Sequence, residues 1–150
     1  MHTPVVLITG ALTGIGRASA VAFAKKGAKL VVAGRHDEAG KALVNELRSF
    51  GSEAEFVNAD VRKEDEVGAL VDKTVARFGR LDVAVNNAGT EGKRGRITEQ
   101  TAESYAATFD TNVLGARSAR HAGPGERQRN QYLLDLWTRG RGRSFNLRRR

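Results

Sequence analysis

Short runs of apolar, often β-branched residues alternate with longer helical patterns through the first 115 residues. Runs of this length between turn residues are typical of strands buried on both faces of a parallel sheet. The longer segments place apolar residues at helical spacing, as in the helices that cross over between such strands. The pattern therefore predicts an α/β protein.

Strands and helices are expected in strict alternation. The predicted strands are 5–8, 29–33, 55–57 and 81–85, and the predicted helices are 15–26, 36–50, 67–78 and 98–114. Inward-facing residues are expected in the second helix at Ala39, Leu43, Leu47 and Phe50, and in the last at Ala102, Tyr105, Phe109 and Val113. Gly27, Gly51 and Gly79 stand where helix ends require positive φ. Right-handed crossovers then give a Rossmann-type parallel sheet of order 3-2-1-4 with flanking helices, incomplete on its C-terminal side.

Charge divides the chain at about residue 115. Residues 1–115 contain equal numbers of basic and acidic residues, so the net charge of +8 lies entirely in residues 116–150, where every basic residue is Arg. That segment has little periodicity and one apolar cluster, 132–137. We expect residues 1–115 to form the domain, and 116–150 to be a basic tail that is non-native or disordered. The alternative is an Arg-Gly interaction arm for RNA or acidic surfaces, although nucleic acid is not the favoured partner.

Composition excludes several other classes. The chain has no Cys, and its three His residues lack metal-ligand spacing, so neither a disulfide nor a metal site is expected. No apolar run is long enough for a membrane span or a signal peptide. A cytoplasmic protein without a membrane partner is the expectation.

A glycine-rich turn, 9–16, connects the first strand to its helix with the spacing G-x-x-x-G-x-G. Glycines there permit a tight turn and close approach of the backbone to a pyrophosphate, and the helix N-terminus offers free N–H groups to the phosphates. Such a turn can also be a tight connection and nothing more. Three further motifs decide between these interpretations: Asp60-Val61, the Asn-Asn-Ala-Gly of 86–89, and Asn112 within 111–115.

With these motifs in this order, residues 4–115 resemble the classical short-chain dehydrogenases/reductases. The resemblance implies hydride transfer between a nicotinamide cofactor and a small alcohol or carbonyl substrate, and an intact protein that is a homo-oligomer. It assigns Gly10, Gly14, Ile15 and Gly16 to the pyrophosphate with Thr13 nearby, Asp60 and Val61 to the adenine, Asn87, Ala88 and Gly89 to the ribose side of the cleft, and Asn112 to the proton-relay water.

Cofactor choice depends on the end of the second strand. An acidic residue there would favour NAD, but this chain has Gly34 followed by Arg35. A guanidinium suits a 2′-phosphate, so NADP is favoured over NAD. Two points oppose this interpretation: Arg35 can be simply a solvated loop charge, and the acidic Asp37 is near in sequence.

The family's catalytic Ser, Tyr and Lys have no counterparts in these 150 residues, because no Tyr-x-x-x-Lys occurs and the last lysine is Lys93. Read one nucleotide later, permitted codons for 131–149 can encode Ser-Ser-Thr-Tyr-Gly-His-Glu and a later Ser-Ile-Tyr, which resembles the family's catalytic segment. We therefore expect a truncated or frameshifted chain that holds the cofactor half and lacks catalysis. The alternative is a non-catalytic nucleotide-binding module with a basic interaction tail.

Overall fold

The computed structural model describes residues 3–92 and 94–115 of the chain. They contain one parallel sheet of four strands, β1 (Val5–Thr9), β2 (Lys29–Gly34), β3 (Ala54–Asn58) and β4 (Val83–Asn86). The strand order is β3-β2-β1-β4, which confirms the Rossmann-type prediction. In the central register Leu7 of β1 stands between Val31 of β2 and Ala84 of β4. All four carboxyl ends consequently meet at one edge of the sheet.

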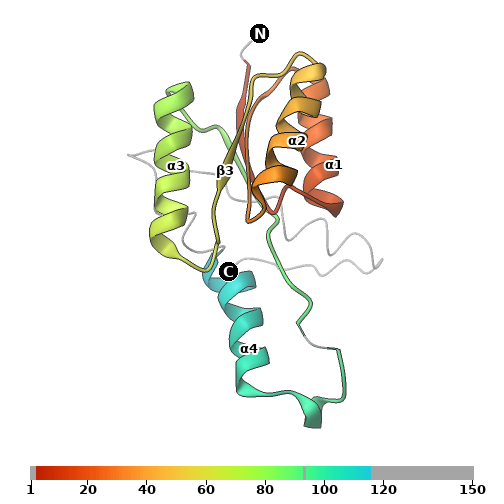
Figure 1. The fold of residues 1–150 in the computed structure, drawn as a ribbon. Helices are drawn as coiled ribbons and strands as arrows, with labels where there is room; N and C mark the ends of the chain where they lie inside the picture. The colour runs from red at the N-terminus through yellow and green to blue at the C-terminus, as the bar shows by residue number, and fades with distance from the viewer. Residues whose placement is uncertain (1–2, 93, 116–150) are drawn as a thin grey trace, which may run out of the picture.

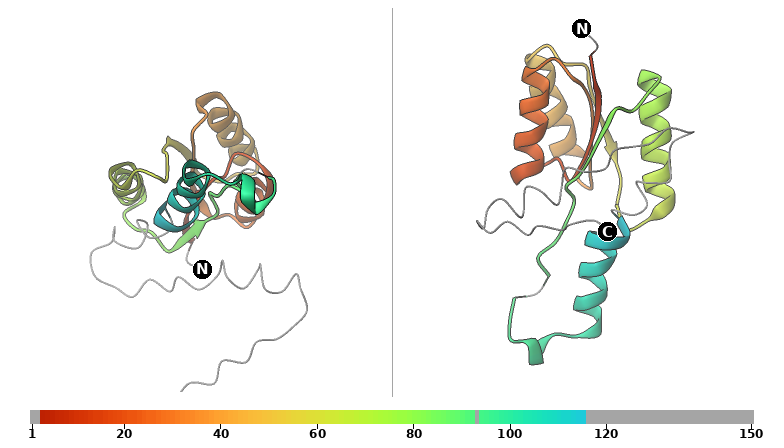
Figure 2. Two further views of the ribbon diagram at one scale, coloured as in Figure 1. Left: turned by 90° about the horizontal axis from the view of Figure 1, so that it is seen from below. Right: turned by 180° about the vertical axis from the view of Figure 1, so that it is seen from behind.

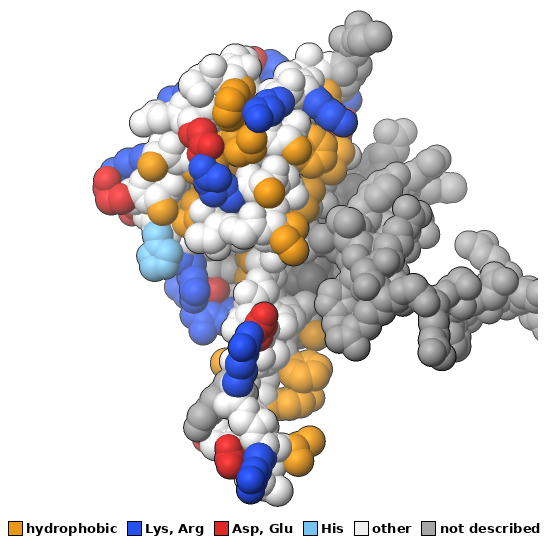
Figure 3. Space-filling model, turned by 90° about the vertical axis from the view of Figure 1, so that its right-hand side faces the viewer, with side chains coloured by type: hydrophobic (Ala, Val, Ile, Leu, Met, Phe, Trp, Pro, Cys, Tyr) orange, Lys and Arg blue, Asp and Glu red, His pale blue; other side chains and the backbone are white. Residues whose placement is uncertain are grey.

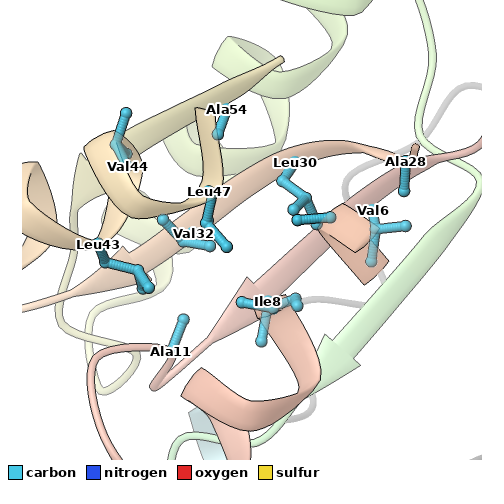
Figure 4. Packing of buried hydrophobic residues seen from close by; sticks show 12 residues of the cluster. Val6, Ile8, Ala11, Ala28, Leu30, Val32, Leu43, Val44, Leu47 and Ala54 are labelled. Carbon is cyan, nitrogen blue, oxygen red and sulfur yellow. The ribbon is translucent and has the colours of Figure 1, made fainter. Parts of the chain in front are cut away.

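Helices cover both faces of this sheet. Figures 1 and 2 show α1 (Gly14–Lys25) and α2 (Asp37–Ser49) on one face and α3 (Glu64–Phe78) on the other. Successive residues of a strand pack against the helices on opposite faces of the sheet, because side chains along a strand point to the two faces in turn. Val6 and Ile8 join the cluster under α1 and α2, drawn in Figure 4, whereas Leu7 joins the cluster under α3.

The buried face of α2 contains Leu43 and Leu47, as predicted, but it includes Gly40 and Val44 in place of Ala39 and Phe50. Gly40, Leu43, Val44 and Leu47 are buried, whereas Ala39 is exposed. Phe50 lies just beyond the helix, is 41% exposed, and has the ammonium of Lys25 over its ring at 5.1 Å. Gly40 takes the place of Ala39 on this face and packs against the ring of Phe56 in β3, with which a Cβ at that position would collide. The absence of a side chain at Gly40 therefore allows α2 to pack closely against the sheet at this position.

The predicted last helix, 98–114, begins only at Ala102 and then runs unbroken to Leu114, but its predicted inward face is wrong. A 3₁₀ turn (Ile97–Glu99) precedes α4 (Ala102–Phe109), and the π-helix η2 (Asp110–Leu114) follows. Thr101 starts α4 as its N-cap, accepting the N–H of Ser104. Tyr105, Phe109 and Val113 are 61%, 44% and 52% exposed, because α4 extends beyond the carboxyl edge of the sheet (Figure 1). Figure 3 shows hydrophobic side chains at the surface of this lower part of the molecule.

The expectations for residues 116–150 fall outside the described part of the chain. Within residues 3–92 and 94–115, no helix is long and apolar enough to cross a membrane. The same residues contain no cluster of His, Cys, Asp and Glu that could hold a metal ion.

Candidate functional site

The hydroxyl of Thr9 joins the carboxyl ends of β1 and β4. Thr9 is 4% exposed, and its Oγ1 accepts the backbone N–H of Asn87 at 3.2 Å and of Ala88 at 3.3 Å. The segment after β4 is thereby fixed to the start of the glycine-rich turn, although 78 positions separate Thr9 from Asn87. This contact holds the carboxyl ends of the paired strands β1 and β4 together.

The amide of Asn87 holds the turn from the same side. Its Nδ2 donates to the carbonyl oxygens of Gly10 at 3.0 Å and Thr9 at 3.3 Å. A Cβ on Gly10 would lie 2.7 Å from the Cα of Ala88, and a Cβ on Gly16 would lie 2.5 Å from Asn87 Nδ2. Four of the sequence-predicted site residues therefore touch one another, and the two glycines are required by close packing inside the protein.

The outer rim of the turn is open. Thr13, Gly14 and Ile15 are exposed, Ile15 to 74%, and a Cβ on Gly14 would have no atom within 4 Å. Thr13 is the N-cap of α1, but its side chain makes no capping hydrogen bond, and the first turn of α1 has no acidic residue. The free N–H groups and the positive end of the helix dipole make such a rim suitable for an anion.

A charged group occupies the carboxyl ends of β2 and β3. Asp60, with its side chain 14% exposed, pairs with the guanidinium of Arg62 at 2.5 Å. The hydrogen bonds from Arg62 lower the pKa of Asp60 to about 2, and the positive charge of Arg35 contributes in the same direction. The Asp60 carboxylate is therefore ionised at any pH near neutrality.

Asn112 forms a separate contact with the loop after β4. Its Oδ1 accepts the N–H of Thr90, and its Nδ2 donates to the Thr90 carbonyl, each at 2.8 Å. A Cβ on Gly89 would lie 3.3 Å from the same Oδ1. Val61 is half-buried, and its carbonyl oxygen would be 2.8 Å from a Cβ on Gly115. The π-helix and the residue that follows it thus contact both the loop after β4 and the β3–α3 loop.

Sequence reasoning missed two residues of this region. Thr9 was noted only as part of the glycine-rich turn, and Arg62 simply follows Asp60-Val61 in the sequence; no role was predicted for either residue. The available signals were a polar residue at the end of an otherwise apolar strand, and a cation two positions from a half-buried carboxylate. Neither signal specifies which distant group the side chain meets.

A parallel sheet of order 3-2-1-4, with a glycine-rich turn between its first strand and helix, defines a Rossmann-type α/β protein. The model of the short chain dehydrogenase family matches residues 4–123. The chain therefore belongs to the short-chain dehydrogenase/reductase family.

Known relatives agree with this assignment. An uncharacterised oxidoreductase of Thermotoga maritima is 47% identical over 111 residues, which cover 74% of this chain and 43% of that protein. The structure of a short-chain dehydrogenase/reductase from Burkholderia phymatum in complex with NAD has a TM-score of 0.74 and 38% identity, covering 78% of this chain and 41% of that one. An actinorhodin polyketide ketoreductase with NADPH has a TM-score of 0.75 and 37% identity, covering 79% and 45%. The chain thus spans less than half the length of these relatives.

Proposed function

We propose that residues 1–115 form the dinucleotide-binding unit of a short-chain oxidoreductase, and that this chain binds a nicotinamide dinucleotide without turning over an alcohol or carbonyl substrate. The observation that carries the proposal is the packing of Gly10 and Gly16 against Asn87 and Ala88 beneath an open rim. When bound, the nicotinamide group would supply the hydride acceptor or donor. No Tyr-x-x-x-Lys is present in the 150 residues to move the accompanying proton.

The proposed contacts follow the position of each residue. The exposed rim of Thr13, Gly14 and Ile15 would receive the pyrophosphate, supported from beneath by Gly10 and Gly16. Asp60 and Val61 would border the base, since both lie just beyond the carboxyl end of β3. The segment Asn87 to Gly89 would border the ribose. The assignment of Asn112 to a relay water stays a prediction, because both ends of its amide are bonded to Thr90.

Gly14→Ala tests the phosphate rim. The expected result is a roughly tenfold rise in the Kd for NADPH, because a methyl group on the rim displaces a phosphate oxygen from backbone N–H donors. Isothermal titration calorimetry on the full chain measures this change. The alanine also meets strain at φ +53°, so a control with equal strain is required.

Gly27→Ala supplies that control. Gly27 has a φ of +77°, its added Cβ would also meet nothing within 4 Å, and it follows the opposite end of α1. Each variant is expected to lose a similar ~1–2 kcal/mol of stability, and only Gly14→Ala is expected to lose NADPH affinity. Equal NADPH affinities in the two variants, or no NADPH binding by the unchanged chain, would contradict the proposal.

We further propose that the dinucleotide is NADP in preference to NAD. Arg35 directly follows β2 and is exposed, and its charge contributes to lowering the pKa of Asp60, so its guanidinium lies within electrostatic reach of the proposed base subsite. The competing acidic residue is engaged elsewhere, since Asp37 Oδ1 accepts a hydrogen bond from Asn58 Nδ2 at 2.6 Å. Arg35 is then the available partner for a 2′-phosphate.

Arg35→Gln is expected to raise the Kd for NADPH by about tenfold and to leave the Kd for NADH nearly unchanged, because only NADPH carries the 2′-phosphate. Lys73→Gln, on the exposed side of α3, makes the same change in net charge away from the site. An equal loss of affinity for both cofactors, or the same shift in Lys73→Gln, would refute the preference.

A further inference from the structure

Arg62 binds the carboxylate of Asp60 with three different N–H donors. Its Nε lies 3.0 Å from both carboxylate oxygens, its Nη2 lies 2.5 Å from Oδ2, and its backbone N–H donates to Oδ1 at 3.1 Å. A carboxylate offers about four lone-pair positions for hydrogen bonds. Arg62 therefore leaves roughly one acceptor position of Asp60 for another donor.

The surroundings fix this pair in place. The backbone N–H of Asp60 donates to Glu66 Oε2 at 2.7 Å, which ties the loop after β3 to the first turn of α3. On its other side Arg62 interacts electrostatically with Asp110 of η2. The Arg62 side chain remains 45% exposed, whereas that of Asp60 is 14% exposed. The carboxylate is thus held in one orientation by a guanidinium at the surface.

We propose that Arg62 is a positioning residue of the base subsite, which presents one fixed acceptor of Asp60 and so selects a purine with a 6-amino group over a purine with a 6-oxo group. The inference rests on the proposed function, because it assumes that a dinucleotide base lies beside Asp60. A 6-amino group donates to a carboxylate, whereas a 6-oxo group is an acceptor and is repelled by it. The fixed orientation of Asp60 matters because a loop side chain that is mobile before binding loses conformational entropy when the base binds, and this loss lowers the affinity.

Titration of Asp60 gives a second consequence. With Arg62 in place the pKa of Asp60 is about 2, so base selection is expected to be constant from pH 8 to pH 5. Without Arg62, the largest cause of the lowered pKa is lost while burial continues to raise it. The Asp60 pKa then rises, and selection for the amino base weakens as the pH falls.

The test compares NADP with its hypoxanthine analogue, in which an oxygen replaces the 6-amino group. By calorimetry on the full chain, NADP is expected to bind about tenfold more tightly than the analogue. In Arg62→Met this ratio is expected to fall to about threefold or less, and to fall further from pH 8 to pH 5. Arg62→Lys keeps the positive charge but loses the planar guanidinium. Its ratio of affinities is expected to lie between those of the unchanged chain and Arg62→Met.

Lys63→Met is the matched control. It removes one positive charge from the neighbouring residue, whose ammonium pairs with Glu66 at 2.7 Å, and it should retain the ratio of the unchanged chain. If both dinucleotides bind but the ratio is the same in the unchanged chain and in folded Arg62→Met or Arg62→Lys, the inference about Arg62 is overturned and the proposed function stands. If neither dinucleotide binds the unchanged chain, both are overturned.

Discussion

Gly16→Ala is expected to lower the free energy of unfolding by about 3 kcal/mol, the largest loss we expect from any single methyl group in the site. The added Cβ would lie 2.5 Å from Asn87 Nδ2, closer still to the carbonyl oxygen of Gly10, and 3.0 Å from the Cα of Ala11. Two of these atoms belong to the backbone, so the strain is not relieved by rotating a side chain. The glycine-rich turn and the segment after β4 must move apart.

Gly68→Ala isolates this effect from helix propensity. Gly68 also lies inside a helix, α3, but a Cβ there would meet nothing within 4 Å. That variant is expected to gain about 0.5–1 kcal/mol, because alanine restricts the unfolded chain and favours the helix. Urea unfolding of both variants, followed by circular dichroism, measures the difference. Stabilisation by alanine at both positions would show that the turn and the segment after β4 are not packed as described.

Thr9→Val is expected to lower the free energy of unfolding by about 2 kcal/mol and to weaken NADPH binding with it. The substitution keeps the shape of a side chain that is 4% exposed but removes its oxygen. The Ala88 N–H then loses its acceptor, whereas the Asn87 N–H keeps the carbonyl of Val85 at 3.1 Å. An unsatisfied N–H at Ala88 loosens the connection between the carboxyl ends of β1 and β4.

Thr74→Val is the same exchange at a second buried threonine. Thr74 is fully buried, and its hydroxyl donates to the carbonyl of Leu70 at 2.8 Å within α3. That carbonyl keeps its helical N–H partner after the exchange, so the expected loss is only about 0.5 kcal/mol. Chemical unfolding and NADPH titration of both variants provide the comparison. If Thr74→Val lowered the free energy of unfolding as much as Thr9→Val, the result would contradict the proposal that the Thr9 hydroxyl connects β1 to the segment after β4.

Local patterns were sufficient for most of the fold. The apolar runs predicted all four strands; each strand ends one residue later than its pattern indicated, and β4 also begins two residues later. Gly27, Gly51 and Gly79 all have positive φ, as their places at helix ends predicted. These features depend on residues near one another in sequence, so periodicity and backbone conformation reveal them.

Amphipathic spacing failed for the last helix. Tyr105 and Phe109 are at the spacing of a buried face, yet they stack on each other at the surface with ring centroids 4.2 Å apart. Spacing shows that two side chains share one side of a helix. Whether another element covers that side depends on the path of the whole chain, and among the described residues α4 has no buried side chain.

Residues a few positions apart in the chain specify the strand and helix pattern, the glycine-rich turn and the family motifs, so these features could be predicted. The folded chain was needed to show that Thr9 accepts the N–H groups of Asn87 and Ala88, and that Gly16 packs against the Asn87 amide. It was needed equally to show that Arg62 takes most of the acceptor positions of Asp60. The long-range contacts follow from the meeting of β1 and β4 at one edge of the sheet, and the Arg62 contact from the orientation of a side chain in a loop. Neither kind of contact can be predicted from the periodicity of the sequence.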